Sequence, residues 1–171
     1  RAHLHFEIGV QMNVKFNEWF DRWYSDGQNF HGNWNGMNLL GLDAAAILKR
    51  ANAESFEMLE HLKSESALCR LIIFRLDFDW LERFPQLVVE NDSENKEAIQ
   101  AWEVDLNFSG IPVRMAPVRS KMRSGGAKYR ILKVNEEVLK KHPCSGLIFR
   151  KGQQWVFTGK GQRAMDLLLY Q

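Results

Sequence analysis

Apolar and polar side chains alternate along several short segments of this chain, and this two-residue period restricts the fold more than any other feature. Within residues 98–108, Trp102, Val104 and Leu106 all fall on one side of the alternation. Successive side chains of a strand point to opposite faces, so the segment predicts a strand with one buried face. Further strands are predicted over 3–10, 68–78, 113–118, 129–134, and a terminal hairpin of 147–149 and 155–157.

A different period indicates the helices. Phe16, Trp19, Phe20 and Trp23 recur at spacings of three and four, which predicts an amphipathic helix over 14–24 with these aromatic side chains in the core. Other helices are predicted over 44–48 behind Asp43 as N-cap, over 55–62, and over 136–141 behind Asn135. Loops or turns are predicted at 27–38, 110–112, 124–126 and 159–161, and an apolar stretch at 164–170 closes the chain.

These elements predict a β-rich α+β fold divided near the polar stretch 63–66. Residues 1–50 form the first part, 51–65 a helical connector, and 66–171 a small antiparallel-sheet domain with short helices. Six Trp and eleven Phe supply large side chains for a core. No apolar run approaches the roughly 20 residues of a membrane helix, so no membrane span is expected.

Charge and cysteine content exclude some partners. The net charge is only +2 and no nucleic-acid-binding motif is present, so nucleic acid is not an expected partner. Cys69 and Cys144 are far apart and outside any C-x-x-C pattern, which excludes a cysteine-based zinc site. They either pair as one disulfide in an exported protein or remain two buried free thiols.

The stretch 114–133 carries seven basic residues and no acidic one. Arg119, Lys121 and Arg123 lie just before the Ser124–Gly126 loop, where they are candidates for binding an anionic polymer. The alternative is a solvated strand face whose charge is balanced by acidic residues elsewhere in the chain.

The opening strand places His3, His5 and Glu7 on one face and apolar residues on the other. Two imidazoles at positions i and i+2 of a strand can converge on a point above the sheet. Neutral imidazole is the commonest protein ligand for metals, and zinc lies about 2.0–2.1 Å from such a nitrogen. The pattern therefore makes this pair a candidate for a zinc site.

The segment Ala2-His3-Leu4-His5-Phe6-Glu7-Ile8 resembles the Gly-x-His-x-His-Phe-Glu segment that closes the active site of LytM/lysostaphin-type zinc peptidases. The later Asn38–Asp43 segment is similar to that family's exit, although Ala44 stands where the family has Pro. The resemblance covers residues 1–50. It implies that they are the C-terminal part of a LytM-like β core, with His5 a zinc ligand and His3 a catalytic base or transition-state stabiliser.

The resemblance also implies partners and a location. The family takes its other zinc ligands from an upstream His…Asp segment, so the zinc site requires that segment and the isolated chain is expected to be inactive. The implied substrate is a peptide of cell-wall peptidoglycan. The implied location is the cell envelope, either periplasmic or secreted.

The remaining histidines and one tryptophan are considered as further ligands or substrate-binding residues. His31, in the Gly/Asn-rich loop, is either a substitute ligand or substrate-facing residue, or a turn histidine bonded to its neighbours. Trp34, in the same loop, is a candidate for an exposed substrate-binding residue. His61 is predicted to be a solvated residue on a helix, and His142 a structural residue at a helix end.

The chain is therefore predicted to be the C-terminal portion of a zinc-dependent endopeptidase that cleaves cell-wall peptides. Two alternatives remain. One is a non-catalytic module that keeps the peptidase scaffold without its metal. The other is a module that binds an anionic polymer through residues 114–133.

Overall fold

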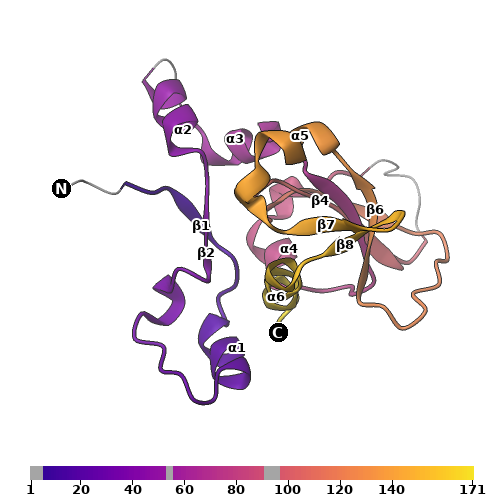
Figure 1. The fold of residues 1–171 in the computed structure, drawn as a ribbon. Coiled ribbons are helices and arrows are strands. Elements are labelled where there is room, and N and C mark those ends of the chain that lie inside the picture. Colours follow the sequence, from indigo (N-terminus) through magenta and orange to yellow (C-terminus); the bar gives the residue numbers. More distant parts are fainter. Residues whose placement is uncertain (1–5, 53–55, 91–96) are drawn as a thin grey trace.

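The computed structural model of the chain describes residues 6–52, 56–90 and 97–171. In chain order its elements are β1 (Gly9–Gln11), α1 (Phe16–Trp23), the 3-10 turn η1 (Gly32–Trp34), β2 (Leu39–Gly41), α2 (Ala44–Ala51), α3 (Met58–Ser64), β3 (Cys69–Ile73), α4 (Asp79–Arg83), η2 (Pro85–Leu87), β4 (Ala101–Leu106), β5 (Pro112–Val118), β6 (Tyr129–Val134), α5 (Glu136–Lys141), η3 (Pro143–Ser145), β7 (Ile148–Lys151), β8 (Gln154–Phe157) and α6 (Gly159–Leu168) (Figure 1). All the strands pair antiparallel, and the predicted β-rich α+β class is confirmed.

Four strands form the main sheet in the order β5-β4-β3-β6. β3 lies in its interior, and Leu71, Ile72 and Ile73 are fully buried, so both faces of this strand are covered. β5 is an edge strand, as Pro117 predicts, because proline cannot donate a ladder hydrogen bond. The alternating residues of β4 are buried as expected.

Helix α1 confirms the predicted helical period. Phe16, Trp19 and Phe20 are buried against one another, with the Phe16 and Trp19 ring centroids 5.5 Å apart. The prediction for Trp23 was wrong, because this last helical residue is 58% exposed. Phe20 is the last buried residue of α1, and the residues after it are exposed to solvent.

The opening strand is shorter than its alternation predicts. Only Gly9–Gln11 form β1, and they pair with Leu39–Gly41 of β2. Residues 6–8 are not a strand, and Phe6 is exposed rather than buried. The partner strand β2 is three residues long, so the ladder has no room for more. The rest of the predicted strand, residues 3–5, lies outside the described residues.

The apolar segment 68–78 was also predicted too long as a strand, since β3 ends at Ile73. The chain then leaves the sheet, forms the short helix α4 and continues into η2. Asp79 and Arg83 join successive turns of α4 through an ion pair of 2.6 Å. Arg83 also donates to the backbone carbonyls of Gln11 and Met12 at 3.0 and 2.7 Å. Contacts distant in sequence therefore hold this helix.

Residues 159–161 were predicted as a turn and instead begin helix α6. Thr158 is its N-cap, because its Oγ1 accepts a hydrogen bond from the Gly161 N–H at 3.1 Å. Two glycines in the first turn make this helix start hard to detect by propensity. The closing apolar residues at 164–168 belong to the same helix.

The predicted caps of α2 and α5 are confirmed. Asp43 accepts from the Ala46 N–H at 3.0 Å, and Asn135 accepts from the N–H groups of Glu137 and Val138. The terminal hairpin of β7 and β8 is also present, with Gly152 at φ +61° in its turn. Each of these features rests on residues close together in sequence.

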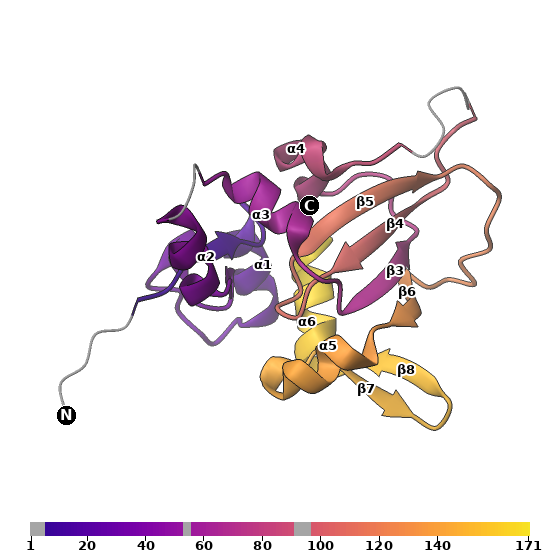
Figure 2. The same cartoon turned by 90° about the horizontal axis from the view of Figure 1, so that it is seen from above.

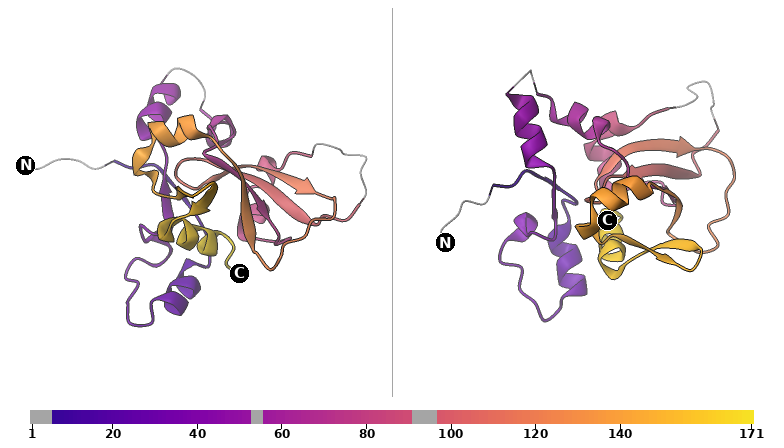
Figure 3. Two further views of the ribbon diagram at one scale, coloured as in Figure 1. Left: turned by 45° about the vertical axis from the view of Figure 1, so that its right-hand side comes forward. Right: turned by 45° about the horizontal axis from the view of Figure 1, so that its top comes forward.

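Buried side chains on both sides of the predicted boundary at 63–66 form one continuous cluster. Figures 2 and 3 show α6 between the N-terminal segment and the four-stranded sheet. Asn13 joins the two parts, because its buried amide donates to the carbonyls of Leu167 and Tyr170, both at 2.8 Å. The division into separate domains stays a prediction. Within the described ranges, no helix has the length and apolar character needed to cross a membrane.

Candidate functional site

The predicted zinc ligand His5 and the predicted catalytic residue His3 lie outside the described residues. The structure describes the backbone pairing of the residues that follow them. The Leu42 N–H donates to the Ile8 carbonyl at 2.8 Å, and β1 then pairs with β2 over three residues. The backbone is therefore fixed from three residues after His5 onward.

His31 and Trp34 lie in the predicted loop, around η1. Trp34 is 75% exposed, which agrees with the exposure predicted for a binding residue. His31 is exposed too, and its backbone N–H donates to the Asn29 side chain at 3.3 Å. The Asn29 amide in turn donates to the Gly32 carbonyl. Asparagine side chains thus hold the loop, and the imidazole of His31 projects from a turn.

His61 is a correction to the sequence prediction, because it is buried and not solvated. Its Nδ1 lies 3.2 Å from the Arg50 guanidinium and its Nε2 lies 3.2 Å from a Glu65 carboxylate oxygen. The ring also packs against Phe56, with centroids 5.8 Å apart. Arginine can only donate, so Nδ1 accepts from Arg50, whereas Nε2 forms no contact with hydrogen-bond geometry. The residue links α2 to α3.

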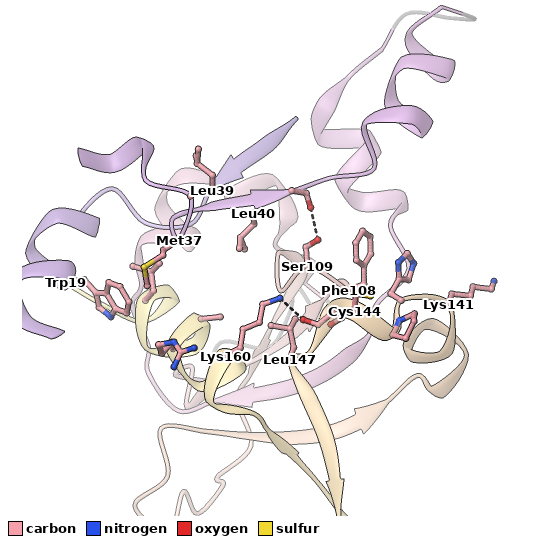
Figure 4. A pocket seen from close by; sticks show the side chains of 18 residues that line it. Trp19, Met37, Leu39, Leu40, Phe108, Ser109, Lys141, Cys144, Leu147 and Lys160 are labelled. Atoms are coloured by element: carbon pink, nitrogen blue, oxygen red, sulfur yellow. Dashed lines mark hydrogen bonds between the residues drawn. The ribbon is translucent and has the colours of Figure 1, made fainter. Parts of the chain in front are cut away.

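A cavity of about 640 Å³ lies between the N-terminal segment and the C-terminal elements (Figure 4). Its lining comes from five separate stretches: Trp19; Gly36, Met37 and Leu39–Gly41; Phe108 and Ser109; Lys141–Ser145 with Leu147; and Lys160, Arg163, Ala164 and Leu167. Most of these side chains are apolar. The Ser109 hydroxyl donates to the Gly41 carbonyl at 2.6 Å and so ties β2 to the turn after β4.

His142 forms part of one cavity wall. Its ring stacks on Phe108, with centroids 3.8 Å apart and planes within 7°. Its backbone N–H closes α5 by donating to the Val138 carbonyl. The structural role predicted for this residue at a helix end agrees with these contacts.

The cavity is lined by three cationic side chains and by no acidic residue. Lys160 donates to the Ser145 carbonyl at 2.7 Å, which fixes its ammonium group at the edge of the cavity. Arg163 follows one turn later on the same side of α6. The sequence analysis missed both residues because it assigned the start of this helix to a turn. Their spacing of three would have indicated a shared face.

Among the described residues, no three histidine, cysteine, aspartate or glutamate side chains lie close enough to hold a metal ion. His31 is therefore not part of such a group in this part of the chain.

The predicted anion-binding residues differ in their surroundings. Arg119 is bound to the protein itself, since it donates to the Glu97 carbonyl at 2.5 Å and pairs with Glu90 at 2.9 Å. Lys121 and Arg123 are exposed and form no ion pair with a described residue. Elsewhere in the stretch, Lys128 lies 3.6 Å from Asp166. Arg114 pairs with Glu103 at 3.3 Å, so the free positive charge is smaller than the sequence suggests.

Cys69 and Cys144 are both free thiols, so the disulfide alternative was wrong, and only Cys69 is buried. Burial, followed by the charge of Asp105, raises the pKa of Cys69 to about 12. Cys144 is exposed and lines the cavity. The two thiols therefore differ sharply in their access to reagents.

Comparison of the chain with protein-family models, with curated proteins and with solved structures found no match. The chain has an α+β fold with a cavity of about 640 Å³. The likeness to LytM/lysostaphin-type peptidases rests on the motif around His3 and His5.

Proposed function

We propose that this chain is the C-terminal portion of a zinc-dependent endopeptidase that cleaves peptides of cell-wall peptidoglycan. The observation that carries the proposal is the His-x-His-Phe-Glu segment at residues 3–7, which leads directly into β1. The site is completed by an upstream His…Asp segment. The protein acts in the cell envelope, in the periplasm or after secretion.

The packing after the motif supports this proposal. Because β1 is paired with β2, and β2 is tied to the turn after β4 by Ser109, the end of the motif is attached to the main body of the protein. A catalytic side chain must be held within a fraction of an ångström of its productive position. The pairing of β1 with β2 begins at Gly9 and so fixes the backbone shortly after the motif.

The two histidines have different roles in this proposal. Bound zinc supplies a Lewis acid that acidifies a water and polarises the scissile carbonyl. His5 provides one imidazole ligand to that ion. His3, two residues earlier in the sequence, would accept a proton or stabilise the developing oxyanion. Trp34, exposed on the loop beyond β1, is available to contact the peptide.

Metal content of the isolated chain is the first test. A usual catalytic zinc site has three protein ligands and His5 supplies only one of them, so the 171-residue chain should hold far less than one zinc per molecule. Metal analysis after dialysis measures this directly. Stoichiometric zinc that a chelator removes would contradict the incomplete site, and its loss in His31→Ala would identify His31 as a further ligand.

The second test restores the upstream segment. His5→Ala should then abolish both bound zinc and cleavage of peptidoglycan, because a ligand is lost. His3→Ala should abolish cleavage and leave most of the zinc. Equal loss of zinc in both variants would show that the roles are assigned wrongly. Far-ultraviolet circular dichroism of each variant checks that the fold is intact.

A non-catalytic binding module is the alternative from another class. The observation in its favour is that Lys121 and Arg123 are exposed beside the Gly125–Gly126 turn without an ion-pair partner in the described part of the chain. An anionic polymer held by two such charges would bind weakly and lose affinity in salt. The pairing of Arg119 with Glu90 makes this the weaker candidate.

A further inference from the structure

The cavity between the N-terminal segment and α6 is not used by the proposed peptidase chemistry. Its volume of about 640 Å³ falls inside the range of about 300–1,000 Å³ that small-molecule sites occupy. Leu39, Leu40, Leu147 and Leu167 belong to the lining, and Figure 4 shows the side chains of Met37 and Leu40 directed toward the open space with Leu147 on its other side. Such walls favour the burial of an apolar ligand.

The charged groups of the lining are all of one sign. Lys141, Lys160 and Arg163 are cationic, and no carboxylate lines the cavity. Lys160 is held in place by the Ser145 carbonyl, and Arg163 has no ion-pair partner among the residues the structure describes. Low-dielectric walls with charges of one sign concentrate ions of the opposite sign. The cavity is therefore complementary to an anion.

We propose that this cavity binds an apolar small molecule that ends in a single carboxylate. Its apolar body would lie against the leucines and Phe108, and its carboxylate would lie near Lys160 and Arg163. The guanidinium presents parallel N–H groups that match the two oxygens of a carboxylate. Because the walls come from both parts of the chain, the ligand would contact the N-terminal segment and the C-terminal elements at once.

Matched pairs of probes test the charge requirement. Decanoate and 4-phenylbutanoate, each compared with its neutral primary amide, are titrated into the full 171-residue chain by calorimetry at low salt. At least one acid should bind about tenfold more tightly than its amide, because the amide cannot form the charge-assisted hydrogen bonds. The binding acid distinguishes an alkyl body from an aromatic one. Raising the salt concentration should lower the affinity for the acid and leave the affinity for the amide unchanged.

Two variants test the location. Arg163→Gln removes one positive charge from the cavity lining and should lower the affinity for the acid about tenfold. Arg150→Gln makes the same change on β7, at an exposed residue outside the cavity lining, and should leave the affinity unchanged. A Cβ at Gly36 would have no heavy atom within 4 Å, so Gly36→Leu fits there and fills part of the cavity. This variant should lower the affinity for both the acid and the amide. Equal thermal midpoints show that the variants fold.

Three results would overturn the proposal. The first is that neither acid binds at millimolar concentration. The second is that an acid and its amide bind equally, which would remove the role of the cations. The third is that the two arginine variants weaken binding equally, which would place the effect in the overall charge of the protein and not in the cavity.

Discussion

Helix α6 packs tightly at Gly161 against Leu147 and against Phe157 of β8, and a single methyl group at this position tests the packing. A Cβ there would overlap the carbonyl oxygen of Leu147 and lie 2.7 Å from Cδ1 of Phe157. The carbonyl has little freedom to move, because it accepts a hydrogen bond from the Thr158 N–H at 2.9 Å. Gly161→Ala should therefore force α6 away from the hairpin.

The magnitude follows from two opposing effects. Overpacking a filled site costs about 1–3 kcal/mol, and alanine in place of glycine returns up to about 1 kcal/mol in a helix. Since the overlap at Gly161 is with backbone, the cost should fall at the upper end, for a net loss of about 2 kcal/mol. For a chain of this size, that corresponds to a fall in Tm of about 4–8 °C.

Gly159 provides a matched control two residues earlier in the same helix. A Cβ at Gly159 meets only the flexible end of Arg163, at 3.8 Å. Gly159→Ala should leave stability unchanged or raise it by up to about 0.5 kcal/mol. Urea unfolding followed by tryptophan fluorescence compares the midpoints of both variants with the unsubstituted chain. If Gly161→Ala is as stable as Gly159→Ala, the close approach of α6 to Leu147 is not present.

Two further outcomes are expected. Asn13→Ala should lower the free energy of unfolding by about 2–3 kcal/mol, because the carbonyls of Leu167 and Tyr170 lose their donor, and a loss below about 0.5 kcal/mol in urea would contradict that role. Iodoacetamide at pH 8 should label only Cys144 in the folded chain, as mass spectrometry of its peptides can show. Because the pKa of Cys69 is raised to about 12 in the folded chain and is near about 8.5 when unfolded, stability should fall as pH rises above about 9, and Cys69→Ala should reduce that fall.

The elements that sequence predicted well depend on neighbouring residues. β6 and α5 have the bounds expected, since an alternating strand meets a capping asparagine at residue 135. Helix α4 could not be found in the same way. It is five residues long, follows an apolar run, and is held by Arg83, which bonds to carbonyls more than 70 residues earlier.

Of the candidate sites too, only the one formed by residues close together in sequence could be predicted. The motif around His3 and His5 is contiguous, so it was visible in the sequence. The cavity is assembled from five stretches between Trp19 and Leu167, and no single stretch carries a recognisable pattern. The burial of His61 likewise depends on Arg50, which lies in a different helix. Partners distant in sequence decide both features.

The hydrogen bonds of Asn13 also set an order of events during synthesis of the protein. Its partners are the carbonyls of residues 154 and 157 positions later along the chain. A ribosome delivers the N-terminal end first, so Asn13 can bond to Asn38 early, whereas its side-chain amide has no native acceptor until those late residues exist. The strand that follows the histidine motif thus completes its docking among the last steps. The N-terminal segment is therefore not fully docked until the C-terminal helix has been made.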